Sequence, residues 1–159
     1  MSERIPMTPA GYQKMLAEFK HHREVLRPQV VRDIEEAREH GDISENAEFE
    51  DAKERQAHIE GRVRELEYRL ALSEVVDVSK MTPSDIVVFG TTVQLEDEDT
   101  EEKFVYRIVG LEEANVREGQ ISYSSPIARA LLGRKVGDSV RFETPKGTRS
   151  VTINAVLYR

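Results

Sequence analysis

The chain has 159 residues, of which 33% are charged and 38% hydrophobic. Its apolar runs are far shorter than the roughly 20 residues of a membrane span, and its first residues lack the hydrophobic segment of a secretory signal, so we expect a cytoplasmic protein with no membrane contact. Cysteine is absent, which excludes disulfides and cysteine-ligated zinc, and the net charge of −7 argues against sequence-independent DNA binding.

Residues 8–76 are predicted to be helical, in two arms that fold back on each other. Thr8 can cap the first helix, with Pro9 at its first position. In each arm, residues at steps of three and four form a seam of the coiled-coil type. These seam positions are Tyr12, Met15, Phe19, His22, Leu26, Val30, Ile34 and Ala37, then Phe49, Ala52, Gln56, Ile59, Val63, Leu66, Leu70 and Ser73. One antiparallel register aligns both seams, so we expect a coiled-coil hairpin.

Two residues interrupt the helical pattern of this hairpin. Pro28 lies inside the first arm, where it should kink the helix and free a carbonyl. Gly41 suits the left-handed position that ends the first helix. Arms of about 30 residues would extend roughly 45 Å. On its pattern alone, such a rod is equally typical of a dimerisation or spacer coil.

The second half of the chain has the pattern of a compact α+β domain. Residues 77–85 are predicted to form a linker between a hairpin at 1–76 and a globular domain at 86–159. Strands, mostly antiparallel, are expected at 86–89, 92–95, 103–109, 139–143 and 150–157. A short helix should run over 125–133, with Ser125 as cap and Pro126 at its first position. The acidic stretch 96–102 is expected to be a solvated hairpin loop.

The turn between the two helical arms concentrates acidic side chains. Nine carboxylates and only two basic residues, Arg38 and Lys53, lie between Glu35 and Glu54. Asp42 and Glu45, three residues apart on a helical turn, would point the same way. Because Mg²⁺ prefers few protein carboxylates, the pair could complete a metal site supplied by another molecule. This spacing is more often explained by a capping box, with Asp42 as the cap and Glu45 reaching back to its amide.

Several enzyme motifs are missing from the sequence. It has no glycine-rich phosphate loop, no nucleophile elbow and no paired-histidine zinc helix, so we do not expect an autonomous enzyme. Arg38 and Lys53 flank the acidic turn and could contact a nucleic acid backbone, although such residues on surface helices usually serve solubility and pairing.

Four segments resemble the bacterial GreA/GreB transcript-cleavage factors. Residues 39–48, EHGDISENAE, are similar to the coiled-coil tip of that family. The segments FGTTV at 89–93, YRIVG at 106–110 and SPIARALLG at 125–133 resemble its C-terminal domain in the same order. The resemblance implies an N-terminal antiparallel coiled coil and a C-terminal domain with the fold of the immunophilin (FKBP-like) prolyl isomerases. The small basic patch resembles GreA more than GreB, although Ser44 is also typical of GreB.

The same resemblance implies partners and residue roles. The globular domain would dock at the secondary channel of RNA polymerase, and the rod would enter the channel. Asp42 and Glu45 would help the polymerase hold a second Mg²⁺, shared rather than stably bound, for cleavage of the 3′ end of backtracked nascent RNA. Arg38 and Lys53 would lie near that RNA. The docking surface would include Ser124, Ser125 and Pro126.

Two other functions remain open on the sequence. The first is a channel-binding inhibitor of RNA polymerase with the same architecture, which an altered pattern of tip acids would favour. The second is a chaperone or prolyl isomerase that uses the immunophilin-like domain, which would require an apolar pocket lined by aromatic side chains.

Overall fold

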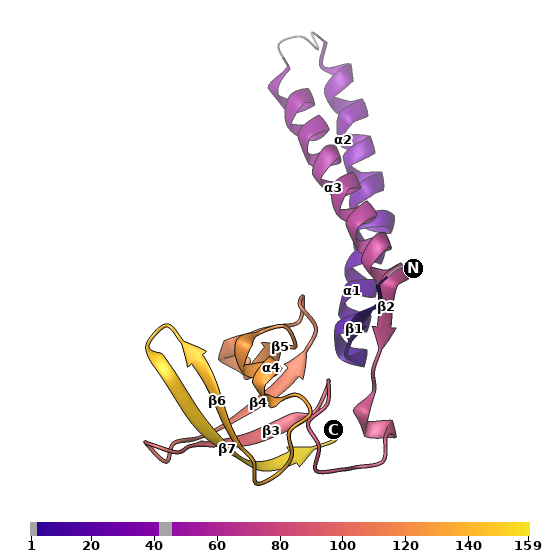
Figure 1. Ribbon diagram of the computed structural model, residues 1–159. Coiled ribbons are helices and arrows are strands. Elements are labelled where there is room, and N and C mark those ends of the chain that lie inside the picture. The colour runs from indigo at the N-terminus through magenta and orange to yellow at the C-terminus, as the bar shows by residue number, and fades with distance from the viewer. Residues whose placement is uncertain (1–2, 42–45) are drawn as a thin grey trace. The chain divides into compact units, whose positions relative to one another are not determined.

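The computed structural model describes residues 3–41 and 46–159 (Figure 1). The chain divides into two compact units. One contains Tyr12–Ser73, and the other contains Arg4–Gly11 and Glu74–Arg159. Within the described ranges no helix is long and apolar enough to cross a membrane.

Two helical arms form the hairpin and lie side by side (Figure 1). The first arm consists of α1 (Pro9–His21), a π-helical turn η1 (His22–Leu26) and α2 (Arg27–Glu39). The second arm is the single helix α3 (Ala47–Leu72). Every predicted seam position is buried or half-buried. The expectation of an antiparallel helical hairpin is therefore confirmed.

Ion pairs join the two arms outside the seam. Arg27 contacts Glu60 at 2.7 Å, Arg62 contacts Glu18 at 2.8 Å, and Arg55 contacts Asp33 at 3.0 Å. All six side chains are partly exposed, so each pair contributes little, on the order of 0.2–1 kcal/mol. Their main effect is to favour one antiparallel alignment of the arms.

The disturbance expected at Pro28 takes the form of the π turn η1. The N–H of Arg27 donates to the carbonyl of His22, five residues earlier. In a regular α-helix the proline ring would collide with the carbonyl four residues before it, that of Glu24. The wider turn accommodates the ring without ending the arm.

A small two-stranded sheet lies where the chain enters and leaves the hairpin. It pairs β1 (Ile5–Met7) with β2 (Ser73–Val75). The prediction of helix as far as residue 76 is therefore wrong, because the backbone turns extended at Ser73 (φ −67°, ψ 142°). Strand β1 was not predicted, since three residues are too few to show the alternating polar and apolar pattern of a strand.

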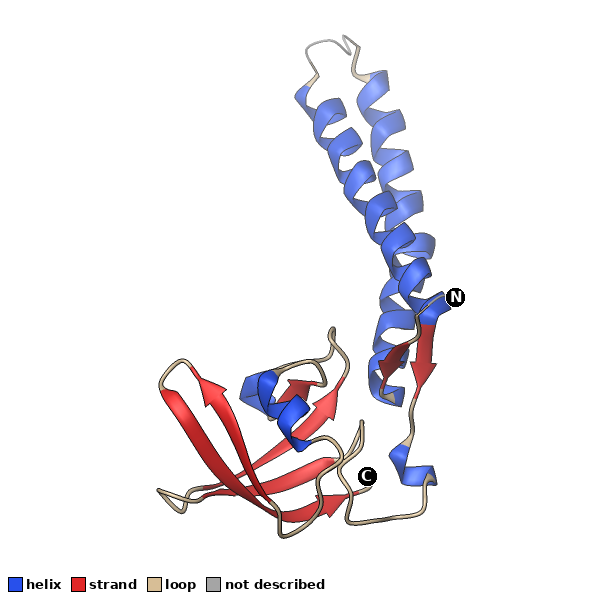
Figure 2. Ribbon diagram, in the orientation of Figure 1, coloured by secondary structure: helices blue, strands red, loops and turns tan. Residues whose placement is uncertain are grey.

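The globular unit is built on a five-stranded sheet with strand order β5-β4-β3-β7-β6 (Figure 2). Its strands are β3 (Thr92–Asp97), β4 (Lys103–Val109), β5 (Gln120–Ser122), β6 (Ser139–Thr144) and β7 (Gly147–Leu157). All neighbours are antiparallel except β4 and β5. The helix α4 (Pro126–Leu131) buries Ala128 and Leu131 in the sheet's core. The α+β expectation is confirmed.

One prediction for this unit is wrong and another is confirmed in part. Residues 86–89 do not form a strand: Ile86 makes only an isolated bridge to Lys135, and the chain then turns at Gly90 (φ +91°). The stretch 96–102 contains the expected hairpin loop, since residues 98–102 are exposed and connect the antiparallel strands β3 and β4. Its first two residues belong to β3, however, and Asp97 is only 4% exposed. A hydrogen bond from the Arg149 guanidinium, helped by the N–H groups of Thr100 and Asp99, lowers the pKa of Asp97 to about 2.

Candidate functional site

The side chain of Asn46 joins the two helix ends at the tip of the hairpin. Its Oδ1 accepts from the N–H of Phe49 at 3.1 Å and so caps α3, while its Nδ2 donates to the carbonyl of Ala37 at 2.6 Å. The same amide thus satisfies a free N–H at the start of α3 and adds a hydrogen bond to a carbonyl near the end of α2 that also accepts from the N–H of His40.

The cap of α3 is Asn46. Asp42 and Glu45 lie outside the described residues. The capping box and the shared metal site, the two explanations offered for this acidic pair, therefore both stay predictions. The sequence did hold a signal for the observed cap, because Asn46 stands three residues before Phe49, the first seam residue of the second arm.

Side chains next to the tip contact one another across the two arms. His40 Nδ1 lies 3.0 Å from Glu48 Oε2, and the guanidinium of Arg38 lies 5.8 Å from the centre of the Phe49 ring. Lys53 donates to Gln56 at 3.3 Å along α3. Arg38 and Lys53 are both exposed, so their cationic groups are accessible to solvent beside the tip.

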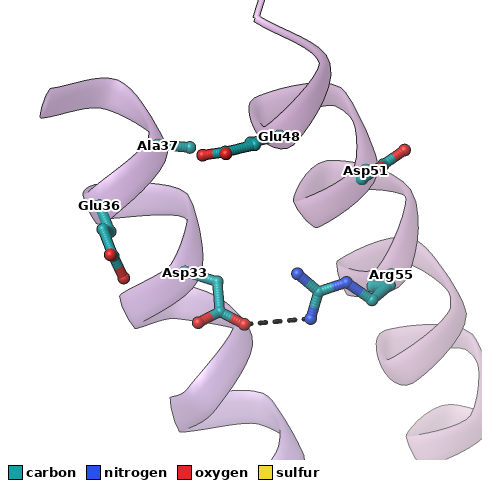
Figure 3. A pocket seen from close by; sticks show the side chains of 6 residues that line it. All are labelled: Asp33, Glu36, Ala37, Glu48, Asp51 and Arg55. Atoms are coloured by element: carbon teal, nitrogen blue, oxygen red, sulfur yellow. Dashed lines mark hydrogen bonds and ion pairs between the residues drawn. The ribbon is translucent and has the colours of Figure 1, made fainter. Parts of the chain in front are cut away.

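An acidic hollow of about 380 Å³ lies between the arms just behind the tip (Figure 3). Asp33 and Glu36 line it from α2, and Glu48, Asp51 and Arg55 from α3. Hydrogen bonds from Gln29 and from Arg55 lower the pKa of Asp33. Among the residues that the structure describes, no three His, Asp or Glu side chains are grouped closely enough to hold a metal ion.

The predicted docking residues have structural partners of their own. Ser125 Oγ accepts from the N–H of Ala128 at 3.3 Å, which caps α4, and donates to the carbonyl of Ser122 at 2.7 Å. The hydroxyl of Ser124 lies 2.9 Å from that of Ser122. Pro126 occupies the first turn of α4, as predicted, and is exposed. These contacts account for both serines as turn and cap residues.

Comparison with known proteins gives the class to which this architecture belongs. The family description "Transcription elongation factor, N-terminal" matches residues 5–75, and "Transcription elongation factor, GreA/GreB, C-term" matches residues 82–158. The chain belongs to the GreA/GreB family of transcription elongation factors.

Within that family, two curated relatives similar to this chain over nearly its full length are GreA proteins. Transcription elongation factor GreA of Rhodopseudomonas palustris (strain TIE-1) is 51% identical over the full length of both chains. GreA of Brucella canis is 51% identical over 98% of this chain and 99% of its own. A solved structure, GreA factor homolog 1 of Thermus thermophilus, is 30% identical over 97% of this chain and 99% of its own, with a TM-score of 0.43. The chain is therefore a GreA-like elongation factor.

Proposed function

We propose that this chain binds RNA polymerase at its secondary channel and stimulates the polymerase's own Mg²⁺-dependent cleavage of the 3′ end of backtracked RNA. Arrested complexes would thereby be rescued. The division of labour follows the two halves of the sequence: residues 1–76 deliver the tip, 77–85 connect, and 86–159 dock. The observation that carries the proposal is the antiparallel helical hairpin, in which Asn46 joins the two helices beside the segment that contains Asp42 and Glu45.

The residues of that segment suit the task chemically. Two carboxylates offer hard oxygen donors, which fit Mg²⁺, and they are too few to hold the ion without further ligands. In the complex, Asp42 and Glu45 would add ligands to a shared Mg²⁺ and orient the attacking water. The ion would stabilise the attacking and leaving oxygens of an in-line displacement.

The flanking residues have supporting roles in this proposal. Arg38 and Lys53 are exposed beside the tip and would contact phosphates of the extruded RNA. Pro126, with Ser124 and Ser125, would belong to the polymerase-docking surface. The chain itself would not be an enzyme, since two carboxylates alone cannot build the two-metal site that the reaction requires. It would act in the cytoplasm, where bacterial transcription occurs.

The test uses stalled RNA polymerase complexes incubated with Mg²⁺ and the purified chain. The expected result is RNA shortened from its 3′ end, and complexes that resume synthesis. Free RNA incubated with the chain and Mg²⁺, without polymerase, should stay intact. Slower RNA synthesis without shortening would instead identify a channel-binding inhibitor, and hydrolysis of free RNA would show that the chain is an enzyme.

A further inference from the structure

The carboxylate of Glu113 accepts hydrogen bonds from the distant residue Thr8 and from the nearby Gly110. Its Oε2 accepts from the N–H of Thr8 at 3.1 Å and from the N–H of Gly110 at 2.8 Å. Its Oε1 accepts from the hydroxyl of Thr8. Thr8 is only 2% exposed, so these groups are largely withdrawn from water. Glu113 therefore connects the loop that follows β4 to the residue that precedes α1.

Glu113 completes a capping box that the sequence of α1 lacks. Thr8 caps the helix as predicted, because its Oγ1 accepts from the N–H of Gly11 at 3.1 Å. In a capping box, a Glu or Gln at that third helical position reaches back to the N–H of the cap residue. Here the third position is Gly11, and the carboxylate that bonds the N–H of Thr8 comes from Glu113.

The two glycines beside Glu113 make room for its carboxylate. A Cβ at Gly11 would overlap the Glu113 carboxyl group, and the three heavy atoms nearest to it all belong to that side chain. A Cβ at Gly110 would lie 2.7 Å from Glu113 Oε2 and also 2.9 Å from the carbonyl oxygen of Pro6. Gly11 has no positive φ, so the backbone itself does not require glycine there. The Glu113 carboxyl group therefore explains why this position has no side chain.

This contact lies where helix α1 begins. Residues Arg4–Gly11 belong to the globular unit, whereas α1 continues from Tyr12 into the hairpin. The pairing of β1 with β2 and the bond from Val76 N–H to the Met7 carbonyl, at 2.9 Å, fix the strand that precedes Thr8. The hydrogen bonds of Glu113 hold the next residue, Thr8, which caps the first turn of the helix.

We propose that Glu113 is a positioning residue: by holding the first turn of α1, it limits the independent motion of the hairpin and so keeps the tip aligned for RNA cleavage. This inference rests on the function proposed above. A small rotation of the hairpin about its base causes a large displacement of its tip. A rotation of about 10° moves a tip roughly 45 Å away by about 8 Å. Displacements much smaller than that suppress reactions that depend on placing groups accurately.

A measurement without polymerase tests the mechanical part. The variants are Glu113→Ala and, as control, Glu118→Ala, an exposed carboxylate in the same connection between β4 and β5. Backbone ¹⁵N relaxation should show the hairpin and the globular unit tumbling more independently in Glu113→Ala than in the wild type. Glu118→Ala should match the wild type. Unchanged coupling in Glu113→Ala would overturn the proposal.

Gly11→Ala supplies a second test, because its effect should change sign. In the wild-type background the added methyl group meets the Glu113 carboxyl and should lower the melting temperature. In the Glu113→Ala background that obstacle is gone, and Ala favours a helix more than Gly does, so the melting temperature should rise. Gly110→Ala should stay destabilising in both backgrounds, because Pro6 still opposes it. The same sign for Gly11→Ala in both backgrounds would contradict the geometry.

The decisive variant combines Gly11→Glu with Glu113→Ala. It restores a capping box within α1 but leaves no carboxylate at position 113 to bond Thr8, so capping and positioning are separated. We expect its melting temperature to recover relative to Glu113→Ala, while the maximal cleavage rate in stalled complexes stays roughly tenfold to 100-fold below wild type. Recovery of cleavage together with stability would show that Glu113 only caps the helix. A wild-type chain that stimulates no cleavage would instead refute the proposed function and leave the relaxation result standing.

Discussion

The two ends of the hairpin are joined by polar side chains that come from very different distances along the chain. At the tip, Asn46 bonds the carbonyl of Ala37, nine residues earlier. At the base, Glu113 bonds Thr8, 105 residues earlier. The tip therefore forms from local sequence, and its geometry should survive changes in the globular unit. The contact at the base needs residues far apart in the chain, so it forms only when the globular unit has folded.

The largest effect is expected for the acidic pair at the tip. Asp42→Asn or Glu45→Gln removes a charge with little change in volume. A metal ligand worth several kcal/mol corresponds to a loss of stimulated cleavage on the order of 100-fold or more. Binding to polymerase, measured by competition with labelled wild-type chain, should stay nearly unchanged. Wild-type cleavage by either variant would remove these residues from the mechanism.

Substitution of Asn46 should give the next largest effect. Asn46→Ala loses both the cap of α3 and the bond to Ala37, and we expect the free energy of unfolding of the hairpin to fall by roughly 1–3 kcal/mol. Asn46→Asp is the matched control, because it keeps an oxygen for the N–H of Phe49 but cannot donate to Ala37. Thermal unfolding should place it between wild type and Asn46→Ala. Equal stability of all three chains would show that Asn46 does not hold the tip.

In the globular unit, Asp97 makes stability depend on acid pH. Its pKa is lowered to about 2, below the value of about 3.9 for an unfolded aspartate, so the ionised form stabilises the fold. This contribution is complete above about pH 4 and is lost as the pH falls toward about 2. The melting temperature of wild type should exceed that of Asp97→Asn at about pH 6. The difference between the two melting temperatures should shrink as the pH falls from about 4 to about 2. A constant difference would exclude ionised Asp97 as its source.

The smallest effect is expected for the ion pairs between the arms. Arg27→Met removes the contact with Glu60 and keeps most of the aliphatic stem, so the cost should be about 0.2–1 kcal/mol. High salt should weaken the difference between the two chains, because the pair is partly exposed. A salt-independent loss above that range would mean that the arginine stem, rather than its charge, stabilises the arms.

The hairpin could be predicted because its signal is local and repeated. Seam residues recur at steps of three and four over both arms, and one register satisfied them all. The strand at Lys103–Val109 was likewise predicted with the observed bounds, from a run of β-branched and aromatic residues. Such signals need only a few neighbouring residues, so tertiary context rarely overrides them.

The missed features depend on contacts between distant segments or on a choice between similar residues. Strand β1 has three residues, and only its pairing with β2 makes it a strand. Glu113 resembles any acidic loop residue until Thr8 is placed beside it. At the tip, Asp42 and Asn46 are equally good caps for the second helix in sequence. The structure shows that α3 begins at Ala47, so its cap is Asn46.

The Mg²⁺ dependence of RNA cleavage in stalled polymerase complexes tests the central claim most directly. If Asp42 and Glu45 add ligands to a shared ion, the chain should lower the Mg²⁺ concentration that gives half-maximal cleavage, and Asp42→Asn should return it toward the value for polymerase alone. A chain that raises the cleavage rate without changing this concentration, in wild type and variant alike, would contradict the claim that the tip helps to bind the metal.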